Sequence, residues 1–131
     1  MEPEALEEFA RRHDVALVIR FGSTVTGRTH PGSDIDLGVL FERLPETIDA
    51  ELRAIADLQL LDTAAEIDVT VLNRADPLLL KQVTDHARLE YGTPERFDAF
   101  RRYAFKRYQD HRPFLDLERQ YVGRAVAARR A

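Results

Sequence analysis

A continuous apolar run, Val15-Ala16-Leu17-Val18-Ile19, stands near the start of this chain. Five successive apolar residues, three of them β-branched, are typical of a strand that is buried on both faces of a sheet. Further segments of strand character follow, so we expect a small sheet of three to four strands: residues 34–41, residues 66–72 and, as a short last strand, residues 88–91.

Helical periodicity lies before, between and after these strand segments. Apolar residues recur there at steps of three and four, which predicts helices that flank the sheet. Prolines at 45 and 77 suit the first turn of a helix, and Pro113 is expected to interrupt the helical tail. The expected helices cover residues 3–13, 45–61, 76–87, 97–108 and 117–130.

This order of elements predicts an α/β (α+β) fold with a small mixed sheet flanked by helices and a helical C-terminal tail. The length of 131 residues is that of one domain. Within it we expect an α/β core over residues 1–93 and basic C-terminal helices over residues 94–131.

Composition narrows the class of protein. The chain has no cysteine, which excludes disulfides and thiol chemistry. It has no apolar run of membrane-spanning length, and its acidic start is unlike a signal peptide, so we expect a cytoplasmic protein without a membrane partner. The net charge of −4 is uneven: ten of the 19 basic residues, against four acidic ones, lie from Arg96 onward. This basic tail is either a docking face or a set of solvated helices.

Three aspartates are the candidate metal ligands. Asp34 and Asp36 lie two residues apart on an expected strand, so both point to one face. Asp68 lies on the polar face of a later strand and joins them if the two strands are neighbours. Three carboxylates can hold two Mg²⁺ ions about 4 Å apart, an arrangement suited to displacement at phosphorus. Asp68 is also a candidate acceptor for a hydroxyl proton.

Gly22 and Ser23 follow the first strand and form a candidate phosphate-binding turn. Glycine allows close approach of the backbone to a phosphate, and the serine hydroxyl can donate to its oxygens. The Lys-Ser/Thr of a P-loop and the glycine spacing of a dinucleotide-binding loop are both absent. Arg28 and Ser33, further along this loop, are candidate nucleotide contacts; each is equally well read as an ordinary loop residue.

The spacing of Gly22-Ser23, ten residues and Asp34-Ile35-Asp36, with Asp68 on a later strand, resembles the DNA polymerase β-like nucleotidyltransferase superfamily. Within it the chain looks most like the minimal nucleotidyltransferases (MNT), which are often antitoxins paired with HEPN ribonuclease toxins. The resemblance implies metal ligation by the aspartates and phosphate binding by Gly22 and Ser23. The loop departs from the MNT pattern at residues 24–26, which leaves Arg28 as a candidate for the missing positive charge.

The leading hypothesis is a Mg²⁺-dependent nucleotidyltransferase that moves AMP from ATP to a hydroxyl and releases pyrophosphate. By resemblance, the acceptor is a tyrosine of a cognate HEPN toxin, which is neutralised within a hetero-oligomer. Three alternatives remain: an antitoxin that acts by stoichiometric binding alone, a small-molecule (aminoglycoside-type) nucleotidyltransferase, and an RNA-tailing enzyme. The net negative charge disfavours a nucleic-acid partner.

Overall fold

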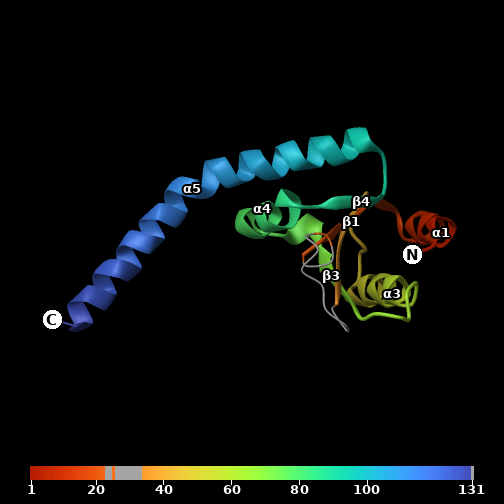
Figure 1. Ribbon diagram of the computed structural model, residues 1–131, viewed down its shortest axis with the longest axis horizontal. Helices are drawn as coiled ribbons and strands as arrows, with labels where there is room; N and C mark the ends of the chain where they lie inside the picture. Colours follow the sequence, from red (N-terminus) through yellow and green to blue (C-terminus); the bar gives the residue numbers. More distant parts are fainter. Residues whose placement is uncertain (23–24, 26–33, 131) are drawn as a thin grey trace.

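The computed structural model describes residues 1–22, 25 and 34–130 and contains a mixed sheet with the strand order β3-β2-β1-β4 (Figure 1). Strand β1 is antiparallel to both of its neighbours, whereas β2 and β3 are parallel. The predicted fold class and all the expected strands, including the short last one, are therefore confirmed. The strands are β1 (Val15–Phe21), β2 (Ile35–Phe41), β3 (Ile67–Val71) and β4 (Arg88–Tyr91).

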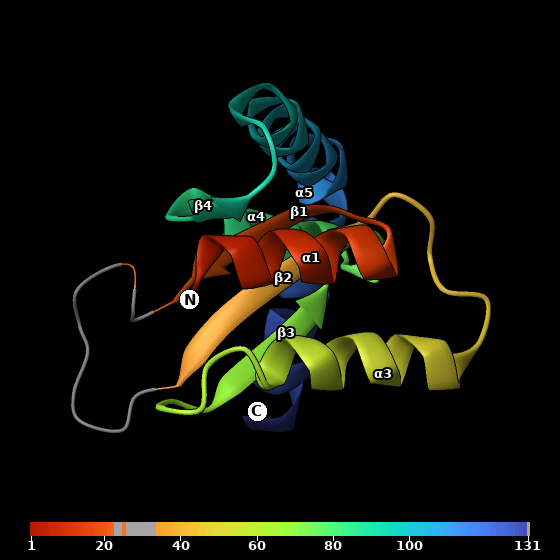
Figure 2. The same ribbon diagram turned by 90° about the vertical axis from the view of Figure 1, so that its right-hand side faces the viewer.

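Helices α1 (Pro3–His13) and α3 (Ile48–Gln59) cover one face of the sheet, in front of the strands in Figure 2. Alternate residues of the central strands, such as Val18 and Leu37, are fully buried against this pair of helices. Leu58 of α3 is the helical counterpart and is equally buried. The alternation leaves the other set of β2 side chains, which includes Asp36, on the opposite face.

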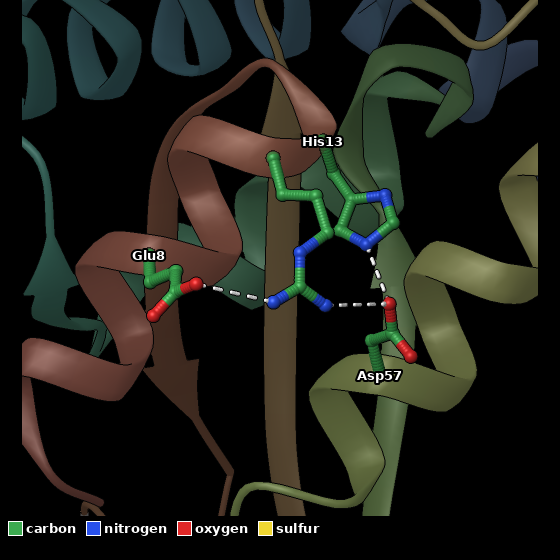
Figure 3. A network of polar contacts seen from close by, with 4 residues as sticks. Glu8, His13 and Asp57 are labelled. Carbon is green, nitrogen blue, oxygen red and sulfur yellow. Dashed lines mark hydrogen bonds and ion pairs between the residues drawn. The ribbon is translucent and has the colours of Figure 1, made fainter.

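A polar network ties α1 to α3 (Figure 3). The Nε2 atom of His13 lies 2.7 Å from Oδ2 of Asp57, which is also 3.6 Å from a guanidinium nitrogen of Arg12. Arg12 in turn lies 3.3 Å from Glu8, one turn earlier on α1. The network belongs to the face that α1 and α3 cover, so we assign it to packing.

The start and the buried face of α3 differ from expectation. The helix begins at Ile48, because the Thr47 hydroxyl accepts a hydrogen bond from the Ala50 amide and caps it there. Ile48 and Leu52, two apolar residues at helical spacing, are exposed, and Glu51 is buried instead. Glu51 forms an ion pair with Arg74 at the end of the short 3₁₀ helix η1 (Leu72–Arg74), so a paired charge takes a core-facing position.

Helix α4 (Pro77–Asp85) and the first half of α5 (Pro94–Arg130) cover the second face. Asp76, directly before the first-turn proline Pro77, caps α4: its side chain accepts a hydrogen bond from the Leu79 amide at 2.8 Å. A second core cluster joins strand β1 to both helices. Its buried members include Ile19, Leu80, Val83, Phe100 and Ala104.

The expected interruption at Pro113 is wrong, because α5 is one helix of 37 residues with Pro113 inside it. A proline removes one backbone hydrogen bond and bends a helix, while the turns on either side keep their bonds. Figure 1 accordingly shows α5 bending partway along and its second half extending away from the sheet. Across residues 1–22, 25 and 34–130, no helix combines the length and apolar character that a membrane span needs.

Candidate active site

The candidate site lies where β1 ends and where β2 and β3 begin. Asp36 of β2 is paired in register with Phe21 of β1 on one side and with Asp68 of β3 on the other. Residues in register on neighbouring strands share a face of the sheet, and hydrogen-bonded strands lie about 4.8 Å apart. The topology thus brings Asp68 beside Asp36, as the sequence predicts for neighbouring strands.

Asp34 lies one residue before β2 and adds a third charge to this group. The backbone amide of Ile35 donates to the carbonyl of Glu66 at 2.8 Å, which fastens the start of β2 to the segment that leads into β3. Asp34 is half-buried and Asp68 is exposed. The carboxylates therefore sit at an accessible end of the sheet, with a packed scaffold behind them.

The surroundings of Asp36 disfavour its ionised form. Burial raises the pKa of the Asp36 carboxyl above its ordinary value, and the charges of Asp68 and Asp34 raise it further. Each of these causes favours the protonated form, so the ionised form is held at an energetic cost in the absence of a cation. A bound divalent ion would remove that cost.

Gly22 is required at this site for two reasons. Its φ is +80°, a backbone conformation that residues other than glycine rarely adopt. A Cβ atom there would also collide with the Asp36 carboxylate and would lie 3.3 Å from its Cγ. The backbone turn at the end of β1 therefore packs directly on the central carboxylate. Sequence reasoning assigned Gly22 to phosphate binding and did not foresee this contact.

The donor set suits Mg²⁺, which prefers a few carboxylate oxygens together with phosphate and water oxygens. Within the part of the chain that the structure describes, no three Asp, Glu, His or Cys side chains are grouped closely enough to hold a metal by themselves. Asp36 and Asp68 are the paired carboxylates that could contribute to an ion, with the charge of Asp34 nearby and nucleotide oxygens completing the ligands. The predicted contacts Ser23, Arg28 and Ser33 lie outside the described residues.

Sequence reasoning did not single out Arg20, two residues before Gly22. Its Nε atom lies 3.0 Å from Oε1 of Glu90 on β4, and both side chains are largely buried. Arg88 approaches the same carboxylate at 3.0 Å. Arg20 thus helps to hold β4 against the end of β1. The signal for it in the sequence was a charged residue within an otherwise apolar strand.

Solved structures with the same fold include toxin–antitoxin proteins. A crystal structure described as a toxin–antitoxin with AMP-PNP has a TM-score of 0.72, 24% identity and coverage of 97% of this chain and 99% of the other. A tri-AMPylated HEPN toxin in complex with MNT antitoxin, from Shewanella oneidensis, has a TM-score of 0.65, 23% identity and 95% coverage of both chains.

A more distant likeness is to an antibiotic-modifying enzyme. The spectinomycin adenyltransferase of Enterococcus faecialis, solved with ATP and spectinomycin, has a TM-score of 0.53 and 15% identity. The match covers 69% of this chain and only 54% of the enzyme.

Sequence comparison identifies the family. No curated protein matches the chain significantly. The family described as polymerase beta, nucleotidyltransferase, matches residues 4–96, which span α1 to the first turn of α5 and include every candidate site residue. This chain belongs to the polymerase beta nucleotidyltransferase family.

Proposed function

We propose that this protein is a Mg²⁺-dependent nucleotidyltransferase that transfers AMP from ATP to a hydroxyl group. The observation that carries the proposal is the register of Asp36 with Asp68, with the Gly22 turn packed against Asp36. A crowded carboxylate group beside a glycine turn joins a site for a cation to a site where backbone can approach a phosphate.

Each residue then has a proposed role. Asp34, Asp36 and Asp68 hold the metal, and Gly22 and Ser23 bind the triphosphate. Arg28 and Ser33 are proposed nucleotide contacts in the same loop. When bound, Mg²⁺, proposed as two ions, supplies charge neutralisation of the phosphates and acidification of the attacking hydroxyl.

The reaction is an in-line displacement. The acceptor hydroxyl oxygen attacks the α-phosphorus of ATP, and the bond from that phosphorus to the oxygen bridging to the β-phosphate breaks. AMP becomes joined to the acceptor, and pyrophosphate leaves. Asp68 is the proposed acceptor of the hydroxyl proton, because it is exposed on the edge strand β3. The nucleotide then lies toward β1, and the acceptor approaches from the β3 edge.

The proposed acceptor is a tyrosine of a cognate HEPN ribonuclease toxin, which makes this chain an antitoxin in a cytoplasmic hetero-oligomer. Support comes from the similarity over almost the whole chain to proteins solved as toxin–antitoxin pairs, one of them tri-AMPylated. The likeness to the spectinomycin enzyme covers only 54% of that enzyme, so it gives less support to a small-molecule acceptor. We accordingly propose residues 1–93 as the catalytic core and residues 94–131 as a segment for partner binding.

Intact mass spectrometry of the partner tests this function. The protein encoded beside this one is incubated with the chain, Mg²⁺ and ATP, and we expect mass increments of one or more adenylyl groups. The increments should be lost with Asp34→Asn/Asp36→Asn. The matched control is Glu2→Gln/Glu4→Gln, which removes two exposed carboxylates at the same spacing and should leave the increments unchanged.

Two results would contradict the proposal. A partner that is neutralised equally by the Asp34→Asn/Asp36→Asn chain, with no added mass, would indicate an antitoxin that acts by binding alone. Added mass on an RNA or on a small hydroxylated compound, but none on the partner, would move the chain to one of the other acceptor classes.

A further inference from the structure

One stripe of side chains runs along α5 and is buried only in its first half. Phe97, Phe100 and Ala104 follow each other at steps of three and four and pack into the second core cluster. The same steps continue through Tyr108, whose ring lies 5.0 Å from the Lys81 ammonium of α4, and then through His111, Leu115, Glu118 and Val122. Figure 1 shows the second half of α5 extending past α4 and the sheet, so the later steps of this stripe lie beyond the rest of the domain.

Large apolar side chains gather on this extended part. Phe114, Leu117 and Tyr121 are 63%, 61% and 76% exposed. With His111, Glu118 and Val122 they line a shallow groove along α5, open to solvent and of about 700 Å³, which begins beside Pro113. A contiguous exposed apolar surface of this kind marks an interaction site.

Charge indicates what covers the surface. Residues 111–130 contain five arginines, at 112, 119, 124, 129 and 130, against Asp116 and Glu118. Two copies of this segment packed together would juxtapose like charges, which disfavours pairing between α5 helices. A partner protein with an apolar groove bordered by carboxylates would be complementary both to the exposed apolar side chains and to the arginines beside them.

We propose that the second half of α5, residues 111–130, is the docking surface for the protein partner, inserting as an amphipathic helix into an acidic-rimmed apolar groove. The proposal rests on the proposed function, because it takes the toxin as that partner. Phe114, Leu117 and Tyr121 are the anchors, one helical turn apart. The surface lies on a different element from the site at Asp36, so binding and transfer are separable.

Binding measurements with the co-expressed neighbouring protein test the surface. Leu117→Asp/Tyr121→Asp should weaken the complex by about 100-fold or more, because two anchors are replaced by charges that the acidic rim repels. The control is Gln120→Asp/Ala127→Asp, which adds the same charges to the same helix on the side away from the groove. We expect the control to bind within about threefold of the unaltered chain, and the affinity of both to fall with added salt.

Several outcomes would overturn the docking surface. These are an unchanged affinity for Leu117→Asp/Tyr121→Asp, no complex with the neighbouring protein, or a dimer of the chain alone that this change dissociates. Binding of a single-stranded RNA that the same change abolishes would assign the surface to a nucleic acid instead.

The two proposals fail in different ways. AMP transfer that persists while the complex is insensitive to the α5 change overturns the docking surface and leaves the enzyme. A complex that is sensitive to the α5 change, but in which no AMP is transferred, overturns the enzyme and leaves the docking surface. The Asp34→Asn/Asp36→Asn chain should still bind its partner normally.

Discussion

The open end of the sheet and the second half of α5 depart from ordinary packing in opposite ways. At the sheet, neighbouring strands hold carboxylates of like charge side by side, and burial together with these charges raises the pKa of Asp36. Along α5, large apolar side chains such as Phe114 and Tyr121 lie in solvent. One region crowds polar groups together, and the other leaves apolar groups without a covering layer.

The difference lies in what holds each region in place. The carboxylates sit on strands whose other face is fully buried, so the fold maintains them despite their repulsion. The second half of α5 is held by its own backbone hydrogen bonds. Places where a sequence breaks local rules are where function is expected, and here the first suits a cation and the second a partner protein.

Truncating a buried leucine of α4 should destabilise the protein far more than truncating a leucine of the exposed α5 surface. Leu80→Ala removes a side chain that is 1% exposed between the sheet and α5, and should lower the free energy of unfolding by about 2–5 kcal/mol. Leu117→Ala, at an exposed position, should change it by less than about 0.5 kcal/mol. Urea unfolding of both variants measures the difference. An equal loss would show that α5 is already covered in the free protein.

The next effect compares two glycines. Gly22→Ala should lower the free energy of unfolding by about 1–3 kcal/mol, because a Cβ there meets both an unfavourable φ and the Asp36 carboxylate. At Gly123 a new Cβ would meet no atom within 4 Å outside its own stretch of helix, so Gly123→Ala adds no clash. It should raise helicity, since alanine favours helix by about 1 kcal/mol over glycine, and should not lower the melting temperature. Thermal melts and circular dichroism provide the test. Equal melting temperatures for the two variants would contradict the contact between the Gly22 turn and Asp36.

Much of the core could be predicted from the sequence because its signals are local. The apolar run at residues 15–19 and the alternation around Asp68 each correspond to a strand of the sheet. The cap at Asp76 could be read in the same way, because a capping residue followed by proline acts within one turn. Such elements depend on neighbours in sequence, which a single chain displays.

Features that depend on tertiary partners could not be predicted. Glu51 is buried because Arg74 reaches it from another element, and no local pattern shows that pairing. A proline in a helix interior kinks or breaks the helix, yet α5 continues through Pro113. At the site, the sequence could propose the aspartates and Gly22, but the register of Asp36 with Asp68 and the contact of Gly22 with Asp36 depend on strand order.

The smallest expected effect is a gain in stability from the proposed catalytic group itself. The pKa of Asp36 is raised in the folded protein, so its ionised form costs stability at neutral pH, and that cost disappears as the pH falls through the raised pKa. Asp36→Asn should therefore be more stable than the unaltered protein at pH 7, by less than about 1 kcal/mol, and the advantage should shrink on acidification. Melting temperatures of Asp36→Asn and the unaltered protein, taken from pH 7 down to below the raised pKa of Asp36, measure this advantage. Glu4→Gln is the exposed control.

Ligand addition should reverse this order of stability. Mg²⁺ with a non-hydrolysable ATP analogue should raise the melting temperature of the unaltered protein and leave that of Asp36→Asn nearly unchanged, because only a protein that binds the ligand is stabilised by it. An Asp36→Asn chain that is less stable at pH 7, or that gains as much from the ligand, would show that the carboxylates at the sheet end are not crowded in preparation for a cation. The exposed α5 surface would then be the only region of the two whose departure from ordinary packing has a functional explanation.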